Sequence, residues 1–162
     1  MIYNEEVLNS IKDILIERNE SIAVAESVTA GHLQAALSAA IDASKFFQGG
    51  ITAYNLGQKA RHLHIDPILG QSANCVDRKI AETMAIEVAK MFSSNYAIGI
   101  TGYASKVPES DDELFAFFCI VHDGNVIKLE RLTAEEQMPF DVQVDYTNQV
   151  LDKLLQQIKE RE

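Results

Sequence analysis

The stretch LFAFFCIVHDGNVIKLERL, residues 114–132, contains two apolar runs rich in aromatic and β-branched side chains, separated by Asp123-Gly124. Runs of this composition form strands, and an Asp-Gly pair between them is typical of a tight β-hairpin turn. The sequence therefore predicts two neighbouring antiparallel strands in the second half of the chain.

Upstream of this hairpin, segments with the apolar spacing of a helix alternate with short apolar segments of strand length. Helices are predicted near Glu5–Arg18, from Leu33 to Ala40, after Asn55 and after Asp77, and strands at Ser21–Ala25, Ile51–Tyr54 and Asn95–Gly102. Pro67 and Gly70 indicate a break between the third and fourth helices.

After the hairpin, an apolar stripe from Val150 to Ile158 predicts a long C-terminal helix. Alternating helices and strands followed by a hairpin are typical of an α/β fold. We therefore expect a three-layer α/β/α domain with a mixed sheet, a C-terminal β-hairpin and a long terminal helix. A chain of 162 residues suits one compact domain, so residues 1–162 are treated as a single unit.

Charge and cysteine usage narrow the classes of function. The formal net charge is −10 and no cluster of Lys or Arg occurs, which argues against a nucleic-acid partner. Cys75 and Cys119 form no CxxC pair, so a zinc ribbon or disulfide scaffold has little support and a reducing cytoplasm fits better. The N-terminus lacks the pattern of a signal peptide, and no apolar run is long enough to cross a membrane. A cytoplasmic protein that acts on a small molecule is expected.

Polar side chains follow three of the predicted strands. They lie in Glu26-Ser27-Val28-Thr29, in Tyr54–Gly57 with Lys59 close behind, and in Thr101-Gly102-Tyr103. Ligands of open α/β sheets bind at the carboxyl ends of strands. The sequence therefore predicts a site built from hydroxyls and one amine.

Ser27 and Lys59 allow two interpretations. A lysine whose pKa is lowered by burial can take the proton of a serine and make it a nucleophile. Spacing alone favours the plainer explanation, in which Ser27 or Thr29 caps a helix and Lys59 is a solvated helix residue. No GxSxG or SxxK motif supports the nucleophile.

Other polar or aromatic groups carry weaker indications. His62 and His64 form an HxH pair without an acidic or Cys partner at ligand spacing, so a surface helix end explains them better than a metal site. Asp111 to Glu113 resemble a solvated loop. The aromatic run from Leu114 to Phe118 is typical of a core strand, because no basic residues accompany it as in a base-stacking surface.

Taken in order, these segments resemble the CinA C-terminal domain family. Its AESCTGG motif is similar to AESVTAG at residues 25–31, and its GSSxxFxGGxVTYSNExK motif is similar to DASKFFQGGITAYNLGQK at 42–59. The chain's IAETMA and AIGITGYA segments look like the family's VAxxMA and AxxxTGIAGP. The order holds from about Ile11 to Ala104. Active members of this family are amidohydrolases that deamidate nicotinamide mononucleotide to nicotinic acid mononucleotide.

The resemblance implies a role for each matching residue. Ser27 would be the nucleophile and Lys59 its base, Ser44 would relay or orient the proton, and Tyr54 would hold the site together. The backbone N–H groups of Val28 and Thr29 would stabilise the oxyanion if a helix begins there. The positions implied for substrate binding are Glu26, Val28, Thr29, Gly31, Gly50, Asn55, Thr101 and Gly102. The resemblance implies a pyridine nucleotide as substrate, no metal, no cofactor and a homo-oligomer.

The chain also departs from the family pattern. Val28 and Ala30 replace the Cys and the first Gly of the CTGG run, and Ala104–Pro108 replaces a Gly-rich loop. The segment at 134–146, where the family carries arginines, has none. Two hypotheses therefore stand: a divergent amidohydrolase, or a non-catalytic member that binds a ligand or a protein partner.

Overall fold

A computed structural model describes residues 1–135 and 138–161 of the chain. The helices are α1 (Glu5–Arg18), α2 (His32–Ser38), α3 (Leu56–Leu63), α4 (Pro67–Ser72), α5 (Arg78–Phe92) and α6 (Pro139–Glu160), with short 3-10 turns η1 (Ala43–Lys45) and η2 (Pro108–Ser110). The strands are β1 (Ile22–Glu26), β2 (Phe47–Thr52), β3 (Tyr96–Gly102), β4 (Phe115–His122) and β5 (Asn125–Thr133).

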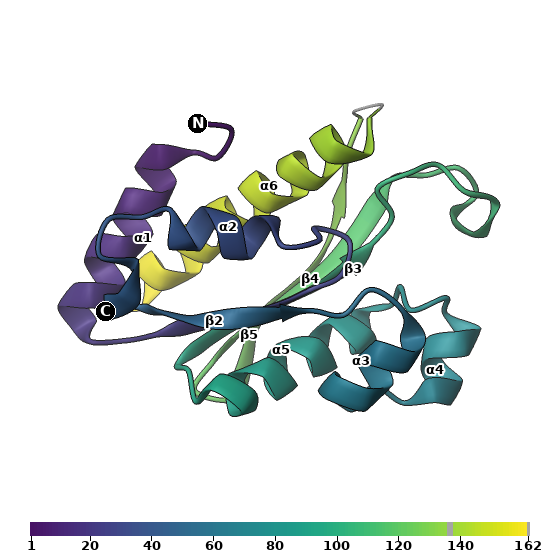
Figure 1. Ribbon diagram of the computed structural model, residues 1–162, viewed down its shortest axis with the longest axis horizontal. Helices are drawn as coiled ribbons and strands as arrows, with labels where there is room; N and C mark the ends of the chain where they lie inside the picture. Colours follow the sequence, from purple (N-terminus) through teal and green to yellow (C-terminus); the bar gives the residue numbers. More distant parts are fainter. Residues whose placement is uncertain (136–137, 162) are drawn as a thin grey trace.

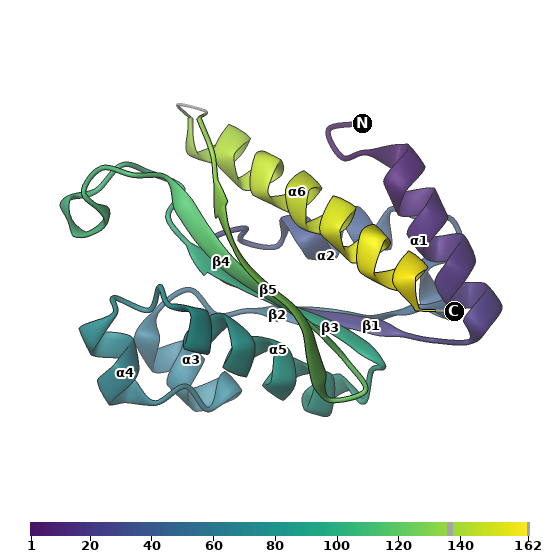
Figure 2. The ribbon, with the colours of Figure 1, turned by 180° about the vertical axis from the view of Figure 1, so that it is seen from behind.

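The five strands form one mixed sheet in the order β2-β1-β3-β4-β5. β1 pairs in parallel with β2 and β3, whereas β4 pairs antiparallel with β3 and β5. Helices α1, α2 and α6 cover one face, and α3, α4 and α5 cover the other (Figures 1 and 2). The predicted three-layer α/β/α fold with a mixed sheet and a long C-terminal helix is confirmed.

The two faces of the central strands bury alternate side chains in two separate cores. Val24 of β1 and Ile98 of β3 belong to the core under α1, α2 and α6. Ala23 and Ala97 belong to the core under α5, where small side chains let the helix approach the sheet. Every residue of β1 is buried, as expected for a strand flanked on both edges and covered on both faces.

The hairpin forms as the sequence predicts. Asp123 and Gly124 have φ angles of 48° and 81°, the left-handed pair that a tight turn between twisted strands requires. β4 and β5 pair from Phe115↔Thr133 to His122↔Asn125. Asn4 and Asp77 also cap α1 and α5 as expected, accepting hydrogen bonds from the backbone N–H groups of Val7 and Lys79.

Three element boundaries differ from the sequence-based expectation. β2 begins at Phe47 rather than Ile51 and ends at Thr52, because Gly49 and Gly50 pair with β1 despite their low strand propensity. α4 forms where a break was expected, since Pro67 occupies its first turn, where proline is tolerated. α2 runs from His32 to Ser38, so it ends two residues before the predicted Ala40.

The parallel pairing brings three chain reversals to one edge of the sheet. Glu26, the last residue of β1, lies opposite Thr52 of β2 and Ile100 of β3. The segments that follow these strands carry the polar side chains predicted for the site. Within the described ranges, no helix combines the length and the apolar character needed to span a membrane.

Candidate active site

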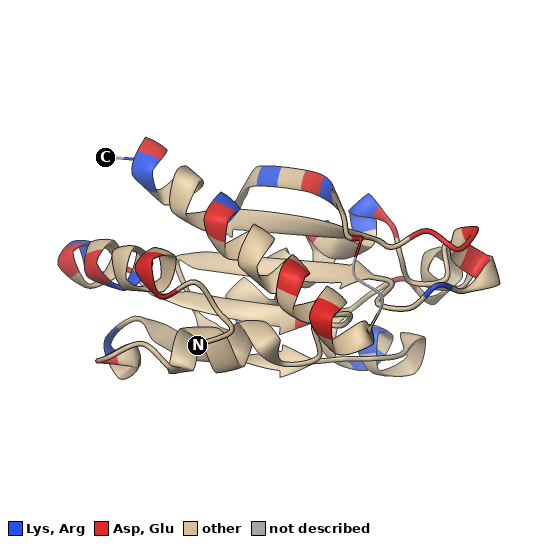
Figure 3. Ribbon diagram, turned by 90° about the horizontal axis from the view of Figure 1, so that it is seen from above, with Lys and Arg blue, Asp and Glu red and all other residues tan. Residues whose placement is uncertain are grey.

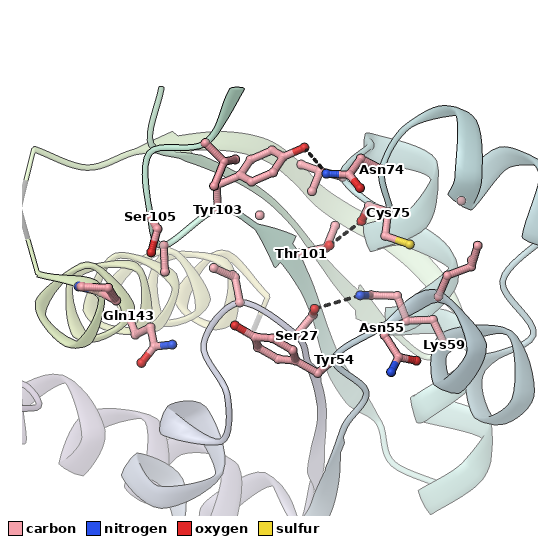
Figure 4. A pocket seen from close by; sticks show the side chains of 18 of the residues that line it. Ser27, Tyr54, Asn55, Lys59, Asn74, Cys75, Thr101, Tyr103, Ser105 and Gln143 are labelled. Carbon is pink, nitrogen blue, oxygen red and sulfur yellow. Dashed lines mark hydrogen bonds between the residues drawn. The ribbon is translucent and has the colours of Figure 1, made fainter. Parts of the chain in front are cut away.

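A pocket of about 600 Å³ lies at the carboxyl ends of β1 and β3. Figure 4 shows Ser27 and Lys59 on its floor, with side chains from several loops around them. The lining residues are Ser27, Val28, Tyr54, Asn55, Leu56, Lys59, Gly70, Gln71, Asn74, Cys75, Val76, Thr101, Gly102, Tyr103, Ala104, Ser105, Val107, Pro139 and Gln143. The volume lies in the range of small-molecule sites.

Ser27 is held in a tight turn directly after β1. Its N–H donates to the carbonyl of Ile100 at 3.2 Å, and its own carbonyl accepts from the N–H of Ala30 at 3.0 Å. Ala30 and Gly31 both have positive φ angles, 50° and 102°. This left-handed pair reverses the chain and leaves the Ser27 side chain facing the pocket. Ala30 adopts the conformation at a cost of about 1 kcal/mol that a glycine there would avoid.

Glu26 anchors this turn to α2. Its buried carboxylate accepts hydrogen bonds from the Thr29 hydroxyl at 2.6 Å and from the Leu33 and Gln34 N–H groups at 2.8 and 3.0 Å. The Gln34 side-chain amide donates a further one at 3.1 Å. The expected cap at Ser27 or Thr29 is therefore replaced, because Gly31 occupies the N-cap position and the Glu26 carboxylate supplies the acceptors. The helix also does not begin at Val28 and Thr29.

Lys59 reaches the pocket floor from α3. Asn55 caps that helix by accepting from the N–H of Gln58, which sets Lys59 in its first turns, facing inward. The Lys59 Nζ donates to the Ser27 Oγ at 2.8 Å, and the residue is only 2% exposed. Burial lowers the pKa of Lys59 from its ordinary value, and the nearby Cys75 opposes this in part. Lys59 is thus not the solvated helix residue of the plainer interpretation.

The opposite wall is braced by hydrogen bonds from other elements. The Thr101 hydroxyl donates to the Cys75 carbonyl, and the Asn74 amide donates to the Tyr103 hydroxyl at 3.0 Å (Figure 4). The Tyr146 hydroxyl of α6 donates to the Tyr103 carbonyl at 2.9 Å. The pocket wall is therefore tied to β3, to α6 and to the segment before α5.

The structure brings most of the predicted site residues together. Those that line the pocket are Ser27, Val28, Tyr54, Asn55, Lys59, Thr101 and Gly102. Tyr54 is 66% exposed, so its ring is available at the mouth of the pocket. Figure 4 shows it beside Ser27.

Five predicted positions lie outside the pocket lining: Glu26, Thr29, Gly31, Gly50 and Ser44. The first three build the turn around Ser27. Gly50 allows β2 to pack closely, since a Cβ there would lie 2.7 Å from Val24 Cγ2 and 2.8 Å from Gln34 Cγ. Ser44 lies in η1 before β2, next to Phe46, whose carbonyl accepts from the N–H of Ile22 at the start of β1. The structure therefore places Ser44 at the opposite end of β1 from Ser27.

Several residues that line the pocket were not predicted from the sequence as site residues. Ser105 follows Tyr103 in the same loop and could have been included with it. Asn74 and Cys75 both have positive φ angles, 51° and 60°, and an asparagine that favours this conformation was the available signal. Gln143 comes from α6, and no local pattern connects it to Ser27.

Metal-ligating side chains gather elsewhere. Among the described residues, Glu20, His122 and Asp123 form a group whose ligand atoms lie within 4.8 Å of one another. His122 ends β4 opposite Tyr96, the first residue of β3, so the group lies at the far end of the sheet. His62 and His64 are exposed and contact Gln58 and Glu87. None of these side chains lines the pocket.

Comparison with known proteins gives a consistent family match. The model of the CinA C-terminal domain family matches residues 4–158. A CinA-like protein of Prochlorococcus marinus is 31% identical over 155 residues, covering 94% of this chain and 36% of the relative. One from Picosynechococcus is 39% identical over 102 residues, covering 63% of this chain and 24% of that protein. The chain thus spans about a quarter to a third of these relatives.

Solved structures share the fold. The competence damage-inducible protein A from Klebsiella pneumoniae superposes with a TM-score of 0.91 at 21% identity, covering 97% of this chain and 98% of its own. A CinA superfamily protein from Escherichia coli gives a TM-score of 0.88 at 24% identity, covering 96% and 90%. At these identities the similarity shows a common architecture.

Proposed function

This chain belongs to the CinA C-terminal domain family, and on that premise we propose that it is an amidohydrolase that converts a carboxamide and water into a carboxylate and ammonia. The family resemblance points to a carboxamide on a pyridine ring. The two free thiols, Cys75 and Cys119, suit a reducing compartment such as the cytoplasm.

The contact between Lys59 and Ser27 carries this proposal. A lysine amine at 2.8 Å from a serine hydroxyl, shielded from water and with its pKa lowered by burial, is suited to general-base catalysis. With the amine neutral, the hydroxyl can donate its proton along the same contact. The plainer explanation gives no reason to bury a lysine at the floor of a polar pocket.

The reaction proceeds in two steps with Lys59 carrying the proton. Ser27 Oγ attacks the carboxamide carbon as Lys59 Nζ takes its proton, and the C–N bond breaks as that proton passes to the leaving nitrogen. Ammonia departs and an acyl ester remains on Ser27. Lys59 then takes a proton from water, which attacks the ester, and the serine is restored by the same proton.

The turn after Ser27 supplies donors for the oxyanion. Within the described part of the chain, no hydrogen bond engages the backbone N–H groups of Val28 and Thr29. Backbone donors next to a nucleophile stabilise the negative charge of a tetrahedral intermediate. These two groups support the proposal although they precede α2 rather than beginning it.

Release of ammonia from nicotinamide, nicotinamide riboside and nicotinamide mononucleotide tests the proposal. We expect the wild type to hydrolyse at least one of them and Ser27→Ala to lower kcat by about 1,000-fold or more. Ser38→Ala is the matched control, because Ser38 is exposed and its hydroxyl donates to the Ala35 carbonyl within α2.

Equal ammonia release by the wild type and Ser27→Ala would refute the serine mechanism. If the wild type binds one of these compounds but hydrolyses none, the non-catalytic binding module becomes the better description.

A further inference from the structure

The pocket is poor in positive charge. All 14 Lys and Arg residues lie within the described ranges, and Lys59 is the one among them that lines the pocket. Its amine is engaged by Ser27. The other polar side chains of the lining are uncharged, and carboxamides are prominent among them: Asn55, Gln71, Asn74 and Gln143.

Lys106, which follows Ser105 of the lining, belongs to an acidic neighbourhood. Lys106 and Arg131 line an adjacent hollow together with Asp112, Glu113 and Glu135. The Arg131 Nη2 is bound to Glu113 Oε2 at 2.9 Å. Lys106 also stands on the loop 103–113, whose other charged residues are all acidic. Figure 3 shows red predominating along this loop at one end of the molecule.

Two helix N-termini around the pocket are capped by side chains, and a third carries a carboxylate in its first turn. Helices often bind phosphate at this end, because unpaired N–H groups point outward there. Asn55 caps α3, and the Asp77 carboxylate caps α5 by accepting from the Lys79 N–H at 2.7 Å. α6 carries Asp141 in its first turn, so a carboxylate already lies at its positive end.

From this distribution of charge we propose that the pocket accepts a carboxamide that carries no phosphate, a nucleoside or free aromatic amide rather than a nucleotide. The inference rests on the proposed amidohydrolase function and narrows its substrate. A phosphate monoester brings about two negative charges and is held in proteins by Arg forks, lysines or open helix ends. Here it would meet neutral amides beside an acidic loop.

The uncharged side chains of the pocket suit a sugar-linked or free aromatic amide. Tyr54 offers an exposed aromatic face at the mouth, which can stack on a flat ring, and such faces also attract a cationic ring. Figure 4 shows Gln143 across the pocket from Lys59, with Ser105 beside it. Amide and hydroxyl side chains pair with sugar hydroxyls without requiring charge.

The test compares nicotinamide riboside with nicotinamide mononucleotide, which differ by one phosphate. We expect kcat/KM of the wild type to favour the riboside by about tenfold or more, the factor associated with one charge-assisted hydrogen bond. Equal or higher kcat/KM with the mononucleotide overturns the inference and leaves the amidohydrolase function standing. If none of the three amides, nicotinamide included, is hydrolysed, the amidohydrolase function fails. The ratio of the calorimetric Kd values of the riboside and the mononucleotide for Ser27→Ala then decides the inference.

Three variants examine the cause of the preference. Gln143→Arg adds a guanidinium to the lining and is expected to raise kcat/KM for the mononucleotide by about tenfold relative to the riboside. Gln143→Met, of similar length and uncharged, should leave the ratio as in the wild type. Lys106→Ala should also preserve the ratio. A selective loss of mononucleotide turnover in Lys106→Ala would show that Lys106 binds phosphate, and would refute the inference.

Discussion

Lys59 is placed where function and stability conflict. An ammonium group loses hydration when it is buried, so burial favours the neutral amine and lowers its pKa. A neutral amine is what a general base needs. The group that makes Ser27 reactive is therefore also one that weakens the folded state at neutral pH.

Lys59→Met is expected to lower kcat and raise the melting temperature. The thioether fills similar space without an amine to desolvate, while the lost base lowers kcat by about 100-fold or more. Between the lowered folded-state pKa and the ordinary value of 10.5, the unfolded chain binds a proton at Lys59 that the folded chain does not. The wild-type free energy of unfolding therefore rises with pH in this window.

Urea unfolding over a range of alkaline pH measures this difference. The gain from Lys59→Met should be largest below the folded-state pKa and should shrink as the pH approaches 10.5. Lys106→Met is the control for the loss of a lysine, because Lys106 is exposed on a loop. A Lys59→Met protein that is less stable than the wild type at neutral pH would contradict this explanation.

The connection from β1 to α2 depends on a single carboxylate. Glu26 stands at the end of the strand and its oxygens bind the first N–H groups of the helix. The turn that holds Ser27 lies between the end of β1 and the first residues of α2, which Glu26 joins. Its geometry is thus fixed at both ends by groups outside the pocket.

Glu26→Gln is expected to lower the free energy of unfolding by about 2–3 kcal/mol. The amide turns an NH₂ group toward backbone donors, so one buried hydrogen bond becomes a repulsive contact. The turn around Ser27 should also loosen and lower kcat. Denaturant titration with an unchanged m-value measures the first effect, and Glu17→Gln on the exposed face of α1 controls for the change in charge. If Glu26→Gln and Glu17→Gln are equally stable, the carboxylate does not anchor the helix.

The ease of prediction differed between elements for physical reasons. The hairpin around Asp123-Gly124 and the helix Glu5–Arg18 follow from local patterns, and both formed as predicted. β2 was misjudged at its start because Gly49 and Gly50 are set in the sheet by close packing, Gly49 on Phe92 and Gly50 on Val24, a tertiary effect. The cap of α2 was misassigned because the acceptor, Glu26, belongs to the preceding strand.

The site was predictable only for residues at or just after the ends of neighbouring strands. Ser27 follows β1, Lys59 follows β2 and Thr101 lies near the end of β3; these strand ends meet at one edge of the sheet, so the topology brings the three residues together. Gln143 reaches the pocket from α6, which the hairpin carries back over the sheet. Its position depends on the packing of the whole chain, and no local pattern encodes it.

The two cysteines differ in burial, so the reactivity of their thiols can distinguish the pocket from the core. Cys75 lines the pocket and is partly exposed. Cys119 is fully buried in β4, within the core under α5, and burial raises the pKa of its thiol from 9.0 to about 12. The thiolate is the reactive form, so Cys119 is protected by both access and ionisation.

An aromatic disulfide reagent at mildly alkaline pH should therefore modify the two thiols at very different rates. Cys75 should react in the native protein, and Cys119 only through global unfolding, with a rate that rises with urea as the free energy of unfolding falls. A saturating ligand at about 100 times its Kd should slow the labelling of Cys119 by about 100-fold, because it binds the folded state alone. Cys75→Ser isolates this signal. If Cys119 in that variant reacts without denaturant as fast as an unfolded thiol, the expectation is wrong, because the sheet then opens locally at β4.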